Sequence, residues 1–455
     1  MKLVYQVDDK PKMSQILIFS LQQLLAILAA TIAVPAIINN GAGTEMSSSA
    51  ALFGAGVGTL VYLLFTKFRS PVFLGSSFAF IGSMLAAFAG GVSMSLGYFG
   101  LIIGAAFGGL VYVVIALIVK KVGVNWIAKL MPAVVIGPTV AIIGLGLAGN
   151  AVGDLFAGKV LDSEANQLAE PYICLICGLV TLFVTMLCSV YGKKFLKMIP
   201  FIVGILSGYA VAAILTVIGN CAGIDALKII DFSAFANMKW YPDFTFIMAM
   251  GSPFEYGEAG SMLPYIGTIA VAYVPVAFVV FAEHIADHKN LSSIIEKDLL
   301  DDPGLHNTLL GDGIGSMAGA IFGGCPNTTY GESIGCVAIS GNASVVTILT
   351  TAIMAIVASF IAPFVTLLAT IPNCVMGGVC VALYGFIAVS GLKMIQGVDL
   401  NDNKNLFVVS VILIAGIGGL SLTFGSINIT AVACALILGI ITNIILSKKE
   451  KLEKK

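Results

Sequence analysis

Long apolar runs recur along the whole chain and restrict its fold more than any other feature. A helix of about 20 apolar residues spans a bilayer, whereas a membrane-crossing strand needs only about ten residues of alternating polarity. Hydrophobic residues make up 58% of the 455 residues and charged residues only 10%, with a mean hydropathy of +1.03. A water-soluble globule carries far more charge. The sequence therefore predicts an all-α polytopic membrane protein.

Polar or charged breaks divide the chain into about fourteen apolar segments, each a candidate membrane span. They start near residues 14, 49, 72, 96, 126, 171, 198, 265, 307, 327, 344, 374, 404 and 428. Basic pairs such as Lys67 with Arg69 and Lys120 with Lys121 fall on one side of this count, which predicts that this side is cytoplasmic. The opposite side receives a long acidic loop. An even number of spans places both termini in the cytoplasm.

Two segments interrupt the helical pattern at matching places. The third segment begins PVFLGSSFAFIGSM at Pro71, and the tenth contains CPNTTYGESIGCV from Cys325. Each holds a stretch bounded by Gly or Pro that is too short to span a membrane alone. Paired interrupted segments are typical of the midplane site in transporters with inverted repeats. With seven spans in each half, the second half enters from the opposite side, so we predict two inverted repeats.

The tenth segment also carries a carboxylate, Glu332, between two apolar runs. An ionisable residue at membrane depth usually faces a cavity or a partner. A half-helix that begins there presents unpaired N–H groups and the positive end of its dipole. Phe78 and Gly331 occupy positions where such N–H groups would emerge, and the rings of Phe78 and Tyr330 offer flat faces, although ordinary packing explains each ring equally well. We expect a site for a planar ligand.

A second intramembrane carboxylate is Glu283, about 18 residues into the eighth span. Asp287 follows one helical turn later on the same face. Burial disfavours the charged form of a carboxyl group, so Glu283 is expected to bind the ligand and to exchange a proton near neutral pH. If the helix ended near Ala286, the residues after it would be solvated. We expect this for His288 and Lys289, and the sequence leaves Asp287 open.

Six motifs occur in a specific order along nearly the whole chain. They are SLQQLLAILAATIAVP from Ser20, LGSSFAF from Leu74, AEHI from Ala282, KDLLDDPGLH from Lys297, PNTTYGE from Pro326 and MGGV from Met376. In this order and spacing they resemble the nucleobase-ascorbate transporter family, also called nucleobase:cation symporter 2. Within that family, the resemblance is strongest to the bacterial uracil permeases.

The resemblance implies fourteen spans in two inverted repeats of seven, with a core domain and a gate domain. Short antiparallel strands in spans 3 and 10 would meet at the substrate site, and a homodimer would form through the gate domain. The implied ranges are 14–150 for core spans 1–4 with gate span 5, 151–220 for gate spans 6–7, 221–264 for an extracellular loop, 265–370 for core spans 8–11, 371–447 for gate spans 12–14 and 448–455 for a cytoplasmic tail.

The resemblance also implies a set of residues that bind the substrate. These are Ala30, Phe78, Glu283, Tyr330, Gly331 and Glu332. The two glutamates would accept hydrogen bonds from the ring N–H groups of uracil, while backbone N–H groups at Phe78 and Gly331 would donate to its carbonyl oxygens. Ala30 and Tyr330 would line the pocket. An analogue without the N–H group would leave a buried carboxylate unpaired.

Three departures from the family pattern concern this site. The usual Gln-His pair of span 1 is Gln22-Gln23 here, and the usual histidine one turn after Glu283 is Asp287. The signature after Glu332, usually Asn-x-Gly ending in Thr-Arg or Thr-Lys, is Ser333-Ile334-Gly335 and ends Ser340-Gly341. The Glu-x-x-x-Asp spacing resembles the purine-transporting branch. Uracil is therefore the first predicted substrate, and xanthine or uric acid stays open.

These observations predict a nucleobase carrier of the cell (plasma or inner) membrane that couples uptake to protons through Glu283 and Asp287. No cofactor or metal site is expected, and the net charge of -1 gives no indication of nucleic-acid binding. Sodium coupling stays open. A channel is less favoured, because no charged ring lines a pore. An enzyme is disfavoured because no nucleophile has a base beside it, and His284 is expected to be a polar packing residue.

Overall fold

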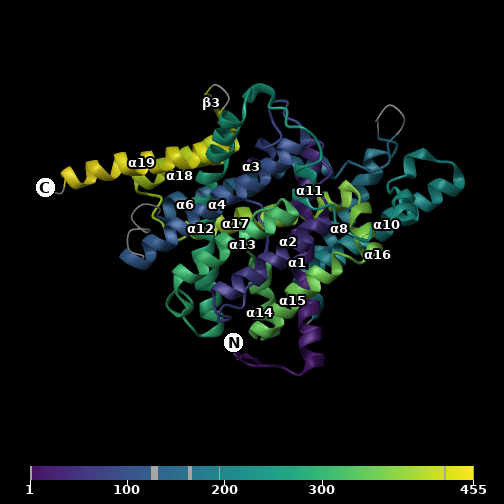
Figure 1. The fold of residues 1–455 in the computed structure, drawn as a ribbon, viewed down its shortest axis with the longest axis horizontal. Coiled ribbons are helices and arrows are strands. Elements are labelled where there is room, and N and C mark those ends of the chain that lie inside the picture. Colours follow the sequence, from purple (N-terminus) through teal and green to yellow (C-terminus); the bar gives the residue numbers. More distant parts are fainter. Residues whose placement is uncertain (1–2, 124–131, 162–166, 194, 425–426, 454–455) are drawn as a thin grey trace.

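The computed structural model describes residues 3–123, 132–161, 167–193, 195–424 and 427–453, and helices dominate it (Figure 1). The longer helices are α1 (Met13–Ala42), α2 (Ser48–Phe65), α4 (Met94–Val122), α6 (Ala133–Gly146), α8 (Pro171–Tyr191), α10 (Pro200–Ala222), α12 (Met262–Ile295), α13 (Leu305–Gly323), α15 (Val345–Ala358), α17 (Asn373–Met394), α18 (Asn403–Ile417) and α19 (Ala431–Glu453). The shorter ones are α3 (Ile81–Ala86), α7 (Ala148–Asp154), α9 (Phe195–Met198), α11 (Thr245–Ala249), α14 (Gly331–Ser340) and α16 (Ala362–Thr370). Short 3₁₀ helices form η1 (Asp225–Leu227), η2 (Phe232–Asn237) and η3 (Gly257–Ala259), and a π-type turn forms η4 (Leu300–Gly304).

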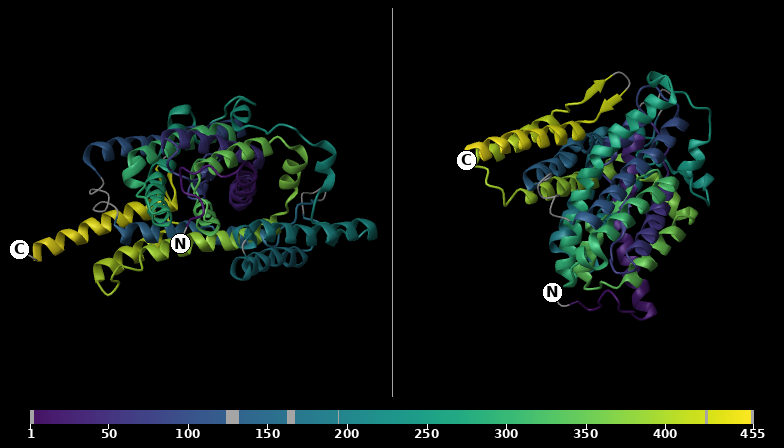
Figure 2. Two further views of the ribbon diagram at one scale, coloured as in Figure 1. Left: turned by 90° about the horizontal axis from the view of Figure 1, so that it is seen from below. Right: turned by 60° about the vertical axis from the view of Figure 1, so that its left-hand side comes forward.

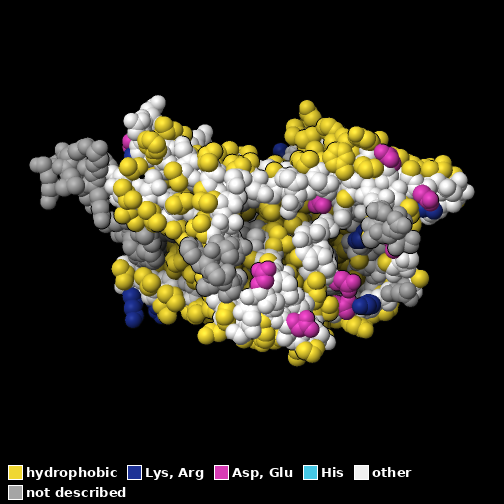
Figure 3. All heavy atoms as spheres, turned by 90° about the horizontal axis from the view of Figure 1, so that it is seen from above, with side chains coloured by type: hydrophobic (Ala, Val, Ile, Leu, Met, Phe, Trp, Pro, Cys, Tyr) yellow, Lys and Arg dark blue, Asp and Glu magenta, His cyan; other side chains and the backbone are white. Residues whose placement is uncertain are grey.

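Within the described residues, eight helices are long and apolar enough to cross a membrane, or nine if the bent pair α15 and α16 counts as one span. The apolar parts of α18 and α19 are shorter. Apolar side chains also cover much of the face that Figure 3 shows. Ile176, Phe183 and Leu187 of α8, for example, are all more than half exposed. Such a surface fits lipid rather than water, so the protein is a multi-pass membrane protein.

Most predicted segments coincide with apolar helices, but the number of crossings and the inverted relation of the halves stay predictions. The predicted start at residue 126 lies in 124–131, outside the described residues. The predicted loop 221–264 contains η1, η2, α11 and η3. The boundary at 150 falls inside α7, and α19 continues to residue 453, so most of the expected tail is helical.

Both interrupted segments form a three-residue strand followed by a short helix. Strand β1 (Leu74–Ser76) pairs antiparallel with β2 (Asn327–Thr329), with Gly75 opposite Thr328. This confirms the predicted strands in the third and tenth segments. The ring of Tyr330 packs over Gly75, where a Cβ atom would collide with it. The pairing therefore holds the start of α14 beside the segment that leads into α3. A second hairpin, β3 (Leu422–Phe424) with β4 (Ile427–Ile429), precedes α19.

Glycine contacts bring α13 close to its neighbours. A Cβ atom on Gly54 of α2 would collide with the backbone at Gly319, and one on Gly313 would meet the backbone of Gly109 of α4. Small residues allow membrane helices to pack at such short range. Helices α2, α4 and α13 thus form one packed unit, while α6 packs against α17 and α8 against α10 (Figures 1 and 2). The site described next is lined by the two interrupted segments, α12, α6, α10 and α17.

Candidate substrate-binding site

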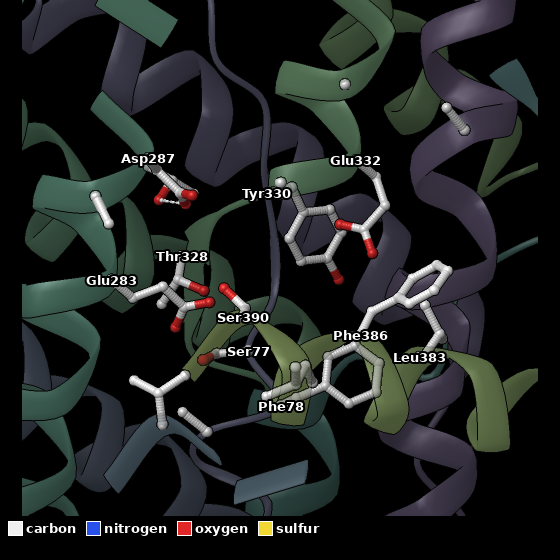
Figure 4. Close-up of a pocket in the computed structure, with 18 of the residues that line it drawn as sticks. Ser77, Phe78, Glu283, Asp287, Thr328, Tyr330, Glu332, Leu383, Phe386 and Ser390 are labelled. Carbon is white, nitrogen blue, oxygen red and sulfur yellow. Dashed lines mark hydrogen bonds between the residues drawn. The ribbon is translucent and has the colours of Figure 1, made fainter. Parts of the chain in front are cut away.

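A cavity of about 420 Å³ lies between the two interrupted segments and α12 on one side and α6, α10 and α17 on the other. Its size falls in the range of small-molecule sites, roughly 300–1,000 Å³. Figure 4 labels ten lining residues, which are Ser77, Phe78, Glu283, Asp287, Thr328, Tyr330, Glu332, Leu383, Phe386 and Ser390. The lining is thus polar along α12 and β2 and, apart from Ser390, apolar along α17.

Three carboxylates face this cavity. Glu283 and Asp287 project from α12, and Glu332 projects from the first turn of α14 on the other side (Figure 4). All three side chains are partly exposed, to the cavity that they line. Thr329 Oγ1 donates to Asp287 Oδ2 at 2.7 Å. In the described part of the chain, the carboxylates of Glu283 and Glu332 receive no comparable side-chain bond. These two are therefore open to a ligand that donates N–H groups.

Backbone N–H groups supply the complementary donors. The first helical hydrogen bond of α14 runs from the Ile334 N–H group to the Tyr330 carbonyl oxygen at 3.2 Å, so the N–H groups just before it lie outside the ladder. A Cβ atom on Gly331 would meet no protein atom within 4 Å, which leaves space for a ligand. Opposite, the Phe78 N–H group has no backbone acceptor among the described residues. The cavity therefore presents both acceptors and donors.

All but one of the residues predicted for the site line the cavity. Those that do are Phe78, Glu283, Asp287, Tyr330, Gly331 and Glu332. Ala30 of α1 does not line the cavity, because neighbouring elements bury it to 1% exposure. Ala26, one helical turn earlier, lies on the cavity wall instead. Tyr330 is also largely buried, and its hydroxyl donates to the Ser76 carbonyl oxygen at 2.8 Å. Its ring therefore joins the two strands as well as lining the cavity.

Two of the departures from the family pattern contact each other beside the site. The Gln23 side-chain amide donates to the Ser333 hydroxyl oxygen and, at 3.3 Å, to the Ser333 carbonyl oxygen. The same hydroxyl oxygen accepts from the Phe73 N–H group at 3.1 Å. Gln23 and Ser333 thus link α1, the segment before β1 and α14. The third departure, Asp287, lies on the cavity wall.

The expectation that His288 is solvated is wrong. Helix α12 does not end near residue 286, and His288 is fully buried with its ring bonded to the Tyr62 hydroxyl at 2.7 Å. Lys289 is exposed, as expected. Sequence reasoning also missed Asp312 of α13, whose carboxylate lies 2.6 Å from His284 Nδ1. The sequence feature that could have identified Asp312 is a lone carboxylate within an apolar, glycine-rich run.

Comparison with known proteins agrees with the fold and the motifs. The Permease family model Xan_ur_permease matches residues 14–424. The uracil permease of Bacillus caldolyticus is 40% identical over 98% of this chain and 95% of its own length. The uracil permease of Escherichia coli (strain K12) is 36% identical, covering 95% of this chain and 92% of the relative.

Solved structures with low sequence identity share the fold. The transmembrane domain of the cyanobacterium bicarbonate transporter BicA aligns with a TM-score of 0.59 at 15% identity, over 96% of this chain and 100% of that one. The murine Slc26a9 anion transporter, in the inward-facing state, aligns with a TM-score of 0.64 at 13% identity. The alignment covers 97% of this chain and 70% of that one. These two resemblances concern architecture alone. From the family match and the extent of the closely related sequences, we conclude that the chain is a membrane transporter that belongs to the Permease family Xan_ur_permease.

Proposed function

We propose that this protein carries uracil into the cell by symport with protons. The observation that carries the proposal is the pairing of two open carboxylates, Glu283 and Glu332, with free backbone N–H groups around one cavity. Uracil alternates N–H donors and carbonyl acceptors around a planar ring, so it matches this arrangement. The uracil permeases that resemble the chain over almost its full length support the same substrate.

The two glutamates would hold the ring by its N–H groups. A charged carboxylate makes one of the stronger hydrogen bonds in proteins, and a protonated carboxyl group still accepts through its carbonyl oxygen. The N–H groups of Phe78 and Gly331 would donate to the ring carbonyls. The Phe78 ring is held edge-to-face against Tyr384 of α17 at 6.0 Å between centroids, and would cover one edge of the ligand. A ligand without these N–H groups would leave a desolvated carboxylate unpaired and bind much more weakly.

Proton coupling in this proposal uses Glu283 and Asp287 and needs no other cofactor. Protonation would remove a charge from the cavity wall and accompany substrate binding. Alternating access would follow from rocking of the core (spans 1–4 and 8–11) against the gate (spans 5–7 and 12–14), related as two inverted repeats. The cavity extends to Lys197 and Met394, on the side predicted to be cytoplasmic, so this arrangement would be inward-facing.

A purine substrate is the second candidate, favoured by Asp287. Its carboxylate lies on the cavity wall one helical turn from Glu283, where it could accept an additional N–H group of a larger ring such as xanthine. The hydrogen bond from Thr329 Oγ1 fixes the carboxylate in that direction. Sodium as coupling ion is the other alternative, because carboxylates coordinate either cation.

Uptake of radiolabelled uracil into proteoliposomes tests the proposal. An inward proton gradient is imposed in sodium-free buffer, with unlabelled xanthine as competitor. We expect accumulation that a protonophore abolishes and that xanthine does not reduce. Accumulation of xanthine without uracil would reject the pyrimidine assignment. Uracil accumulation that requires sodium and ignores the proton gradient would reject proton coupling.

A further inference from the structure

The face of α12 that points away from the cavity carries a second set of ionisable groups. Helical spacing places Glu283 and Asp287 towards the cavity, while His284 and His288 face α13 and α2. The two imidazole rings stack at 4.0 Å between centroids. Asp312 of α13, 1% exposed, faces the first of them. The proposed transport mechanism uses none of these three buried groups.

Hydrogen-bond arithmetic fixes how many protons His284 and Asp312 share. The Thr308 hydroxyl donates to the Leu305 carbonyl oxygen at 3.0 Å, so it can only accept from His284 Nε2, which lies 3.0 Å away. In that arrangement His284 Nε2 carries a proton. The 2.6 Å contact between His284 Nδ1 and Asp312 Oδ2 needs one further proton, on either atom. The pair is neutral overall with that proton and carries a net negative charge without it.

Losing that proton would be costly, because an unpaired charge buried at membrane depth is strongly disfavoured. The neighbouring groups also disfavour loss of the proton. Glu283 and Asp287 lie on the opposite face of α12 and would repel a second negative charge. Tyr112 of α4 meets the His284 ring edge-on at 6.0 Å, and its hydroxyl has no partner among the described residues.

A hydrogen-bonded chain leads from the neighbouring ring towards the surface. His288 Nδ1 donates to the His284 carbonyl oxygen at 2.8 Å, and its Nε2 lies 2.7 Å from the Tyr62 hydroxyl, which is 2.7 Å from Ser70 Oγ. The next residue, Arg69, has a side chain that is 53% exposed. The Tyr62 hydroxyl donates to Ser70 Oγ and can then accept from His288 Nε2, which fits a protonated ring. A neutral ring requires both directions to be reversed. The same atom positions accommodate either state.

We propose that Asp312 and His284 form a proton-binding pair, separate from Glu283, that must hold its proton for transport to proceed. This inference rests on the proposed carrier function and adds a site to it. The proton moves between Asp312 Oδ2 and His284 Nδ1 within the pair, or leaves to solvent, and no bond between heavier atoms changes. Because His284 follows Glu283 directly on α12, loss of the proton would disturb the helical turn that presents Glu283 to the substrate.

The pH dependence of uracil exchange between compartments of equal pH tests this pair. In the wild type we expect exchange to fall at alkaline pH, by about tenfold for each further unit once the pair has lost its proton. Asp312→Asn keeps a donor facing His284 Nδ1, which imitates the protonated carboxyl group, so the part of the alkaline fall that comes from this pair should disappear and only the fall that comes from Glu283 and Asp287 should stay. Tyr112→Phe, which removes an unpartnered hydroxyl beside the same ring, is the matched control and should follow the wild type.

An alkaline fall in Asp312→Asn identical to that of the wild type would overturn the proposal, because the fall would then belong to another group such as Glu283. Wild-type protein without uracil exchange would instead reject the proposed substrate. The two failures are therefore distinguishable.

Nitrogen-15 NMR of labelled histidine provides a second readout that does not depend on a folded Asp312 variant. The chain has only three histidines, and His306→Gln leaves the two of α12. We expect the His284 Nδ1 signal to shift over the pH range in which exchange falls, because Nδ1 either carries the shared proton or accepts a hydrogen bond from it, and does neither once the proton is lost. A His284 Nδ1 signal that stays unchanged throughout that range would contradict the proposal.

Discussion

At the scale of single residues, Glu283 combines a place on the cavity wall with a carboxylate that stays available to a ligand. Glu283→Gln keeps the shape of the side chain but removes its charge and its capacity to exchange a proton. We expect proton-driven uracil accumulation to be lost, as measured in proteoliposomes. Glu258→Gln, on the exposed turn η3, is the matched control and should accumulate uracil normally. Normal accumulation by Glu283→Gln would remove this residue from the mechanism.

The Ser333 hydroxyl oxygen accepts hydrogen bonds from both the Gln23 side-chain amide and the Phe73 backbone N–H group. Ser333→Ala would leave these buried donors short of an acceptor, at a cost of about 1–3 kcal/mol. We expect a lower thermal unfolding temperature in detergent, and weaker uracil binding because α14 loses a link to α1. In a double-mutant cycle with Gln23→Ala, the effects should be less than additive. Fully additive effects would show that the two side chains do not act together.

At the scale of elements, the strand pair β1 and β2 decides where two half-helices begin. Gly75→Ala would push a methyl group into the ring of Tyr330 and separate the strands. We expect a clear loss of uracil binding, measured by equilibrium binding to purified protein, together with reduced thermal stability. Gly82→Ala in α3, where a Cβ atom meets nothing within 4 Å, is the control and should bind uracil normally. Unchanged binding by Gly75→Ala would argue against this role for the strands.

At the scale of the whole molecule, the fourteen-span prediction places both termini in the cytoplasm and loop 221–264 outside. Labelling of single cysteines with a membrane-impermeant maleimide in intact cells measures this, after the exposed Cys221 is changed to Ser. We expect Ser252→Cys to react directly and Asp8→Cys to react only after the cells are permeabilised. Both positions are exposed in the structure. Direct labelling at position 8 would contradict the predicted topology.

The homodimer implied by the family is also a prediction at this scale. Apolar side chains on α8 and α10, such as Phe183 and Ile214, are exposed and are available to lipid or to a second copy. Mass measurement of the protein in a native-like bilayer disc distinguishes one copy from two. A single copy that transports uracil would show that the site needs no partner.

Hydropathy and local breaks in the helical pattern were enough to predict the membrane environment, the two interrupted segments and the carboxylates Glu283 and Glu332. Helical spacing also put Asp287 on the face of Glu283. The choice of Ala26 over Ala30 for the cavity wall depends on the packing of α1, because a helix exposes whichever face its neighbours leave free.

Tertiary packing equally decided the partners of buried polar groups. His288 and Tyr62 lie 226 positions apart, and Gln23 and Ser333 lie 310 apart. No local pattern indicates such pairs, since each residue alone is compatible with a solvated helix end or an ordinary polar contact. A charge or amide buried in a membrane must find a partner somewhere. The need for a partner can be predicted from the sequence. Which residue becomes the partner depends on how α1, α2, α12, α13 and α14 pack.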